Sequence, residues 1–62
     1  MSPGIMTDRE HALLRIEDAL AEVHEARKII LGTSPVLFEL LGSARSYLNK
    51  AILRAKREIE KS

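Results

Sequence analysis

The chain has 62 residues, of which 45% are hydrophobic and 3% aromatic, and its formal net charge is +1 at pH 7. This length allows one domain at most, and the absence of cysteine excludes disulfide bonds and thiolate zinc sites. Because so short a chain is only marginally stable alone, we expect a second copy or another protein to supply part of its stability.

Residues 1–6 precede the first predicted helix, and we expect them to form a flexible tail. They contain no charged stretch followed by a long apolar run, which is the pattern of a secretory signal. No stretch of the chain approaches the roughly 20 apolar residues of a membrane span. We therefore expect a cytoplasmic protein with no membrane partner.

A first helix is predicted over about residues 8–31. Thr7 and Glu10 have the spacing of a capping box, in which each side chain accepts a hydrogen bond from the backbone amide of the other residue. Neither Gly nor Pro follows until Gly32, which suits the left-handed residue that commonly ends a helix. At roughly 100° per residue, one broad apolar stripe forms on this helix. It consists of Ala12, Leu13, Ile16, Ala19, Leu20, Val23, Ala26 and Ile30.

A turn is predicted at residues 32–34, followed by a second helix over about residues 35–61. Ser34 suits the N-cap, and Pro35 suits the first helical position, where no amide is needed. Gly42 is a weak point at which this helix could kink or restart. The apolar stripe of the second helix consists of Leu37, Leu41, Ala44, Leu48, Ala51, Ile52, Ala55 and Ile59.

The two stripes predict an all-α fold, an antiparallel two-helix hairpin, because so short a connection makes the helices antiparallel neighbours. Residues that face each other across the hairpin should have numbers that add up to roughly 66. The acidic half of the first helix then lies beside the basic half of the second. This register also predicts a cross-hairpin ion pair between Arg27 and Glu39.

Further apolar residues lie outside the two stripes, mainly around the turn. A helix packed on one neighbour needs an apolar arc of about 100°, and the stretch from Val36 to Leu41 covers about twice that arc. A lone hairpin cannot bury these side chains, so we expect them to contact a second copy of the chain or another protein. The predicted interface set comprises Leu14, Ile29, Leu31, Val36, Phe38, Leu40 and Leu53.

We accordingly expect a self-associating, coiled-coil-like protein, most simply a homodimeric four-helix bundle, with a tetramer as the alternative. The predicted function is protein–protein interaction by a small regulatory or adaptor protein. The alternative is a small nucleic-acid-binding regulator. It would use a basic stripe on the second helix, whose spacing could follow a phosphate backbone. The basic stripe consists of Lys50, Arg54, Arg57 and Lys61.

The sequence offers little support for catalysis or metal binding. Thr33 and Ser34 are explained by helix capping, and no His shares a face with Ser43 or Ser46. His11 and His24 point in different directions, so they do not form a ligand pair. We expect no enzymatic activity, no cofactor and no metal site.

Overall fold

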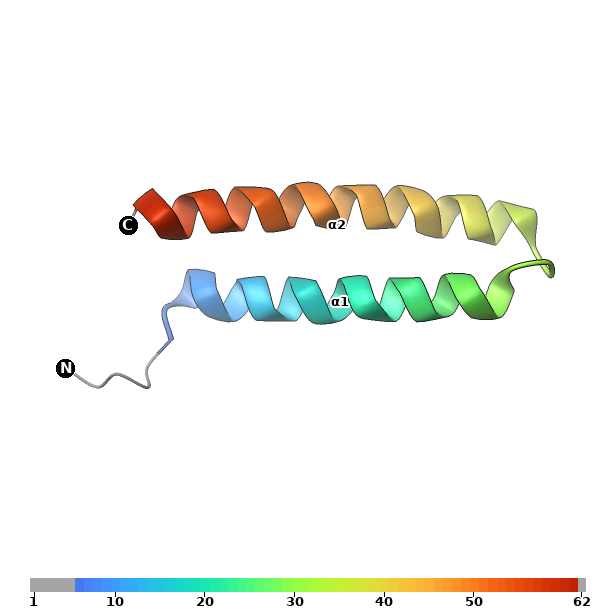
Figure 1. Cartoon of the computed structure of the whole chain (residues 1–62), viewed down its shortest axis with the longest axis horizontal. Coiled ribbons are helices and arrows are strands. Elements are labelled where there is room, and N and C mark those ends of the chain that lie inside the picture. The colour runs from blue at the N-terminus through green and yellow to red at the C-terminus, as the bar shows by residue number, and fades with distance from the viewer. Residues whose placement is uncertain (1–5, 62) are drawn as a thin grey trace.

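The computed structural model describes residues 6–61, which form two antiparallel helices lying side by side (Figure 1). Helix α1 spans Asp8–Ile30 and has 23 residues, and helix α2 spans Pro35–Lys61 and has 27 residues. The predicted all-α hairpin is thereby confirmed. Helix α1 ends one residue earlier than expected, and residues 1–5 of the expected tail lie outside the described residues.

Helix α1 begins with the capping box expected from the sequence. The Thr7 hydroxyl accepts a hydrogen bond from the Glu10 amide at 3.2 Å, and the Glu10 carboxylate accepts one from the Thr7 amide at 3.0 Å. Hydrogen bonds from the Thr7 backbone and side chain lower the pKa of Glu10. Two amides that would otherwise lack a helical partner are satisfied in this way.

The two helices are joined by a tight turn that depends on one glycine. The Thr33 amide donates to the Ile30 carbonyl at 2.9 Å, Leu31 has φ −58° and ψ 124°, and Gly32 has φ +86°. These values are those of a type II turn, which needs a positive φ at its third residue. Ser34 then caps α2, since its hydroxyl accepts a hydrogen bond from the Leu37 amide at 3.3 Å.

The contact between the helices follows a heptad pattern. Half-buried residues recur at alternating intervals of three and four along both helices, as in a coiled coil. We call this set the seam. On α1 it consists of Leu13, Ile16, Leu20, Val23, Arg27 and Ile30, and on α2 of Phe38, Leu41, Arg45, Leu48, Ile52, Ala55 and Ile59.

The seam corrects the sequence prediction at the start of α2. Phe38 was expected at an outer interface and Leu37 in the stripe, but Phe38 is half-buried and Leu37 is 48% exposed. A seam with a period of 3.5 residues drifts by about 20° per heptad around a straight helix. Over the three heptads from Ile59 to Phe38 this drift moves the contact from Leu37 to Phe38.

A single seam leaves the hairpin without a closed interior. None of the residues 6–61 is fully buried, and the seam side chains are only half-buried. Continuity of α2 through Gly42 shows that this residue does not break the helix. The described fold is therefore one layer of two helices, with a broad surface on each side of the seam.

Candidate interaction surface

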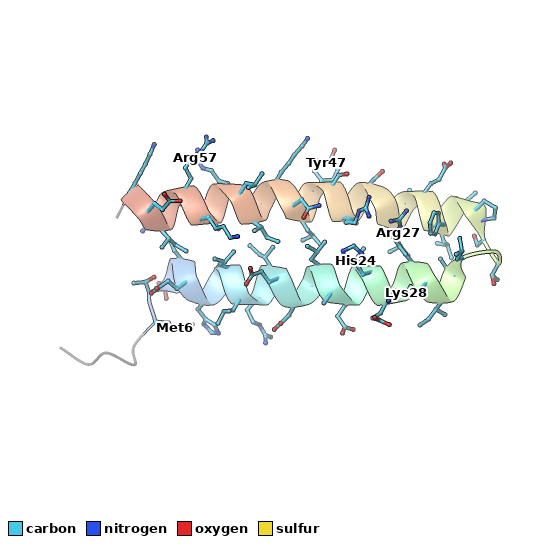
Figure 2. The ribbon with its side chains drawn as sticks, in the orientation of Figure 1. Met6, His24, Arg27, Lys28, Tyr47 and Arg57 are labelled. Carbon is cyan, nitrogen blue, oxygen red and sulfur yellow. The ribbon has the colours of Figure 1, made fainter. Side chains whose placement is uncertain are left out.

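Six of the seven residues in the predicted interface set are exposed. Ile29 is 78% exposed, and the other five are Leu14, Leu31, Val36, Leu40 and Leu53. Sequence reasoning missed two further large apolar side chains that are exposed on the helices, Leu37 and Tyr47. Tyr47 is 71% exposed and lies along the outer edge of α2 (Figure 2).

Phe38, the seventh residue of the set, is half-buried and contacts Arg27. The Arg27 guanidinium carbon lies 4.1 Å from the centroid of the Phe38 ring, which is a cation–π contact. Arg27 lies between the two helices (Figure 2). The side chain of Arg27 thus occupies a seam position and covers the ring from the α1 side.

The predicted ion pair between Arg27 and Glu39 is wrong. Among residues 6–61, the ion pairs are Arg9–Glu58, Lys28–Glu25 and Arg54–Glu58. The Nε atom of Arg27 is buried and has no hydrogen-bond partner. The predicted register is nevertheless close to that observed, because Arg27 meets Phe38, the residue next to Glu39. The guanidinium stacks on this aromatic ring in the seam, while Glu39 is exposed.

Gly42 provides the space for this guanidinium. A Cβ atom added at Gly42 would lie 3.3 Å from a terminal nitrogen of Arg27 and 3.6 Å from its guanidinium carbon. Any side chain at this position would therefore press on Arg27. The glycine in the middle of α2 is explained by this close approach.

The positions beside the seam differ between the two faces of the hairpin. In each heptad, the first position (a) is the seam residue that is followed by the next seam residue three positions later, as Leu13 is followed by Ile16. In an antiparallel pair, the residues just before these first positions lie on the same face in both helices. On α1 these residues are alanines, and on α2 two of them are alanines. We call the surface formed by Ala12, Ala19, Ala26, Ala44 and Ala51 the alanine face.

The alanine face is bordered by large apolar side chains toward the turn. Leu37 belongs to the same row of positions, and Ile29, Leu40 and Tyr47 lie in the adjacent outer row. Charged groups border it at the open end of the hairpin, where Arg54 and Glu58 lie. One face of the hairpin thus carries alanines beside the seam and large apolar side chains toward the turn, with Arg15 and Glu22 in the outer row of α1.

The opposite face is more polar. Glu10, Glu17 and His24 lie beside the seam on α1, and Asn49 and Lys56 lie beside it on α2. Leu14, Leu31 and Leu53, which belong to the predicted interface set, lie on this side as separate apolar residues. Within the interface set, the structure therefore separates Ile29 and Leu40 from Leu14, Leu31 and Leu53, which lie on a face of different chemistry.

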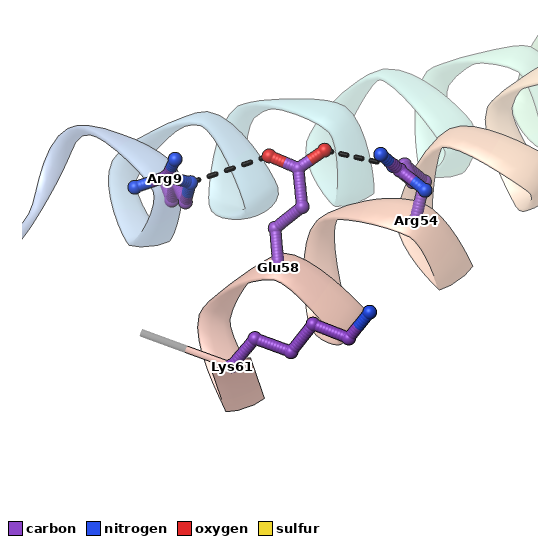
Figure 3. Close-up of a pocket in the computed structure, with 4 residues that line it drawn as sticks. All are labelled: Arg9, Arg54, Glu58 and Lys61. Atoms are coloured by element: carbon purple, nitrogen blue, oxygen red, sulfur yellow. Dashed lines mark hydrogen bonds and ion pairs between the residues drawn. The ribbon is translucent and has the colours of Figure 1, made fainter.

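The basic stripe lies along the exposed side of α2, and one of its members is held by a carboxylate. The Glu58 carboxylate accepts hydrogen bonds from Arg54 Nε at 2.8 Å and from Arg9 Nε at 3.2 Å (Figure 3). These contacts, with Arg54 contributing most, lower the pKa of Glu58. Together with Lys61, the three residues line a pocket at the open end.

The other members of the stripe are placed differently. The Nζ atom of Lys50 lies 5.7 Å from the centroid of the Tyr47 ring. Arg57 extends from the outer edge of α2 (Figure 2). Because Arg54 is already paired with Glu58, the positive charge of the stripe is partly neutralised. The basic stripe therefore does not present four independent cations to a phosphate backbone.

Comparison with protein-family models, with curated proteins and with solved structures finds no match for this chain. Within residues 6–61, no group of three His, Cys, Asp or Glu side chains could hold a metal ion. Neither described helix is long and apolar enough to cross a membrane.

Proposed function

We propose that this chain is a small protein–protein interaction protein of the regulatory or adaptor kind, and that it acts as a self-associated hairpin, most simply a homodimeric four-helix bundle. One observation supports this proposal above the others. Residues 6–61 contain no buried side chain, whereas large apolar residues such as Ile29, Leu40 and Tyr47 are more than half exposed. Burial of such side chains stabilises an association by roughly 25 cal/mol per Å² of apolar surface.

The proposal is tested by solution mass, measured by light scattering after size exclusion from micromolar to millimolar chain. We expect twice the monomer mass over the upper part of this range. A monomer at every concentration would refute self-association.

A matched pair of variants tests whether the apolar surface carries the association. Leu40→Glu places a charge on an exposed apolar position, and we expect it to shift the mass toward the monomer. Ser43→Glu introduces the same charge one turn later at an exposed polar position, and we expect it to leave the mass unchanged. Equal effects of the two variants would show that charge alone causes the shift.

Nucleic-acid binding by the basic stripe is the alternative function. It is supported by the exposed position of Lys50, Arg57 and Lys61 on α2, and it is weakened by the pairing of Arg54 with Glu58. If the stripe binds a phosphate backbone, charge reversal at Arg57 should abolish binding, and the affinity should fall steeply with salt concentration. Fluorescence anisotropy with a labelled RNA or DNA duplex measures both effects.

A further inference from the structure

Alanine in the rows beside the seam makes the alanine face flat. Ala26, Ala44 and Ala51 are half-buried, and Ala12 and Ala19 are exposed. Small side chains at such positions let a further helix approach closely, down to interaxial distances of about 8 Å. The face can therefore receive helices in register along much of its length, which the charged opposite face cannot do without burying Glu17 or Lys56.

The pattern of residues on this face is nearly the same when it is read in either direction. On α1, Ala12 and Ala26 lie seven residues to either side of Ala19, and two residues of opposite charge, Arg15 and Glu22, lie four residues before it and three residues after it. On α2, Ala44 and Ala51 lie to either side of Tyr47. Such a surface is complementary to itself after a rotation of 180°, which is the requirement for a two-fold interface.

The centres of the two patterns lie at the same level of the hairpin. The Arg9–Glu58 hydrogen bond and the contact of Arg27 with Phe38 establish which residues face each other. In this register Ala19 of α1 and Tyr47 of α2 lie at the same height along the hairpin. One axis can therefore serve both helices at once.

We propose that a second copy of the chain docks on the alanine face, related by a two-fold axis that passes between the Ala19 side chains of the two copies. This inference rests on the proposed self-association and specifies its surface and direction. The axis sets α1 antiparallel to α1 of the second copy. Arg15 of each copy then faces Glu22 of the other, which gives two equivalent ion pairs.

The borders of the face fit the same arrangement. The turn end of each hairpin lies over the open end of the other, so Ile29 and Leu40 approach Arg9 and Arg54 of the second copy. The guanidinium groups of these arginines are held by Glu58, and their aliphatic stems offer apolar surface to the incoming side chains. Alanines occupy the centre of the interface, and the charged groups of Arg9, Arg54 and Glu58 lie at its rim, which is polar in protein interfaces generally.

Two alanines of α1 provide a matched test of the face. Ala19 lies on the alanine face, whereas Ala21, two residues later and also exposed, lies on the other side of α1. Glutamine preserves helix propensity and charge while adding bulk. We expect Ala19→Gln to raise the dimer dissociation constant at least about tenfold, because both copies carry the change, and Ala21→Gln to stay within about twofold. Sedimentation equilibrium gives both constants.

Cysteine cross-linking tests the position of the axis. The chain has no cysteine of its own, so a single introduced thiol can pair only with its counterpart in the second copy. A disulfide requires Cβ atoms about 4 Å apart. Under mild oxidation we expect Ala19→Cys to form a covalent dimer rapidly and Ala21→Cys to remain reduced in the same period.

The outcomes separate this inference from the proposed function. A wild-type chain that stays monomeric refutes the proposed function itself. A wild-type dimer that is weakened by Ala21→Gln and not by Ala19→Gln leaves self-association in place and overturns the choice of face. A dimer that is sensitive to Ala19→Gln but does not cross-link through Ala19→Cys overturns the two-fold axis proposed here.

Discussion

Arg27 and Phe38 of the seam form one packing unit with Gly42, which lies beside the seam. The guanidinium lies against the ring at 4.1 Å, and the missing Cβ of Gly42 leaves room for it. Glycine inside a helix costs roughly 0.5–1 kcal/mol relative to alanine. A cation–π contact contributes a similar amount, about 0.5–1 kcal/mol at partly exposed sites. The two effects therefore offset each other in the natural chain.

A double-mutant cycle tests this coupling. With Arg27→Ala as the background, Gly42→Ala should raise the free energy of unfolding by about 1 kcal/mol, because only helix propensity changes. In the natural chain the gain should be clearly smaller, since the new methyl group displaces the guanidinium. Urea unfolding followed by circular dichroism at one chain concentration measures both values. Equal gains in the two backgrounds would show that Gly42 and Arg27 are independent.

Glu58 makes the open end of the hairpin sensitive to acid. Its hydrogen bonds with Arg54 and Arg9 hold its pKa in the folded chain below its ordinary value of 4.5. A carboxyl group with a depressed pKa stabilises the fold above its unfolded pKa, and this contribution is lost as the pH falls through the folded value. We therefore expect Glu58→Gln to lower stability at pH 7 and to reduce the loss of stability below about pH 4.5.

The matched control for Glu58 is Glu60→Gln, which removes an acid from the same turn of α2 without breaking a hydrogen bond across the hairpin. Thermal unfolding at a series of pH values distinguishes the two variants. If the stability of the two variants depends on pH in the same way, the hydrogen bonds of Glu58 to Arg54 and Arg9 do not contribute to acid sensitivity.

At the scale of the elements, the connection between α1 and α2 depends on the backbone conformation of Gly32. Its φ of +86° is the only positive φ within residues 6–61. Residues with a Cβ atom adopt this region at a cost of about 1–2 kcal/mol. A side chain at Gly32 would meet no neighbouring atom within 4 Å, so the cost of substitution is one of backbone strain.

Gly32→Ala should consequently destabilise the hairpin by about 1 kcal/mol or more. Thr33→Ala, a substitution in the same turn at a residue without positive φ, should have a much smaller effect. Chemical unfolding of both variants at equal chain concentration provides the comparison. A Gly32→Ala chain as stable as Thr33→Ala would mean that the turn can adopt another conformation at no cost.

At the scale of the whole molecule, stability and association are expected to be linked. The hairpin has one half-buried seam, and a second copy would complete its interior. Binding of a partner to the folded state alone stabilises that state by mass action. The midpoint of thermal unfolding should therefore rise as the chain concentration increases. A midpoint independent of concentration over a hundredfold dilution series would argue that the hairpin folds alone.

The local features of this protein were readable from its sequence. Thr7 and Glu10 determined the start of α1, and Gly32, Ser34 and Pro35 determined the turn, because each acts through backbone groups within three residues of itself. Hydrophobic periodicity predicted the two helices, and the short connection between them predicted their antiparallel packing. The exposure of Ile29, Leu31, Val36 and Leu40 also followed from their angular position.

How the helices meet depends on contacts between residues far apart in the chain. The seam has a period of 3.5 residues, and this small difference from a straight helix exchanges the places of Leu37 and Phe38 over three heptads. The preference of Arg27 for the Phe38 ring over Glu39 depends on atoms of both helices, including the absent side chain of Gly42. The gathering of alanines on one face likewise requires the register of both helices, since neither helix alone shows which of its edges adjoins the other.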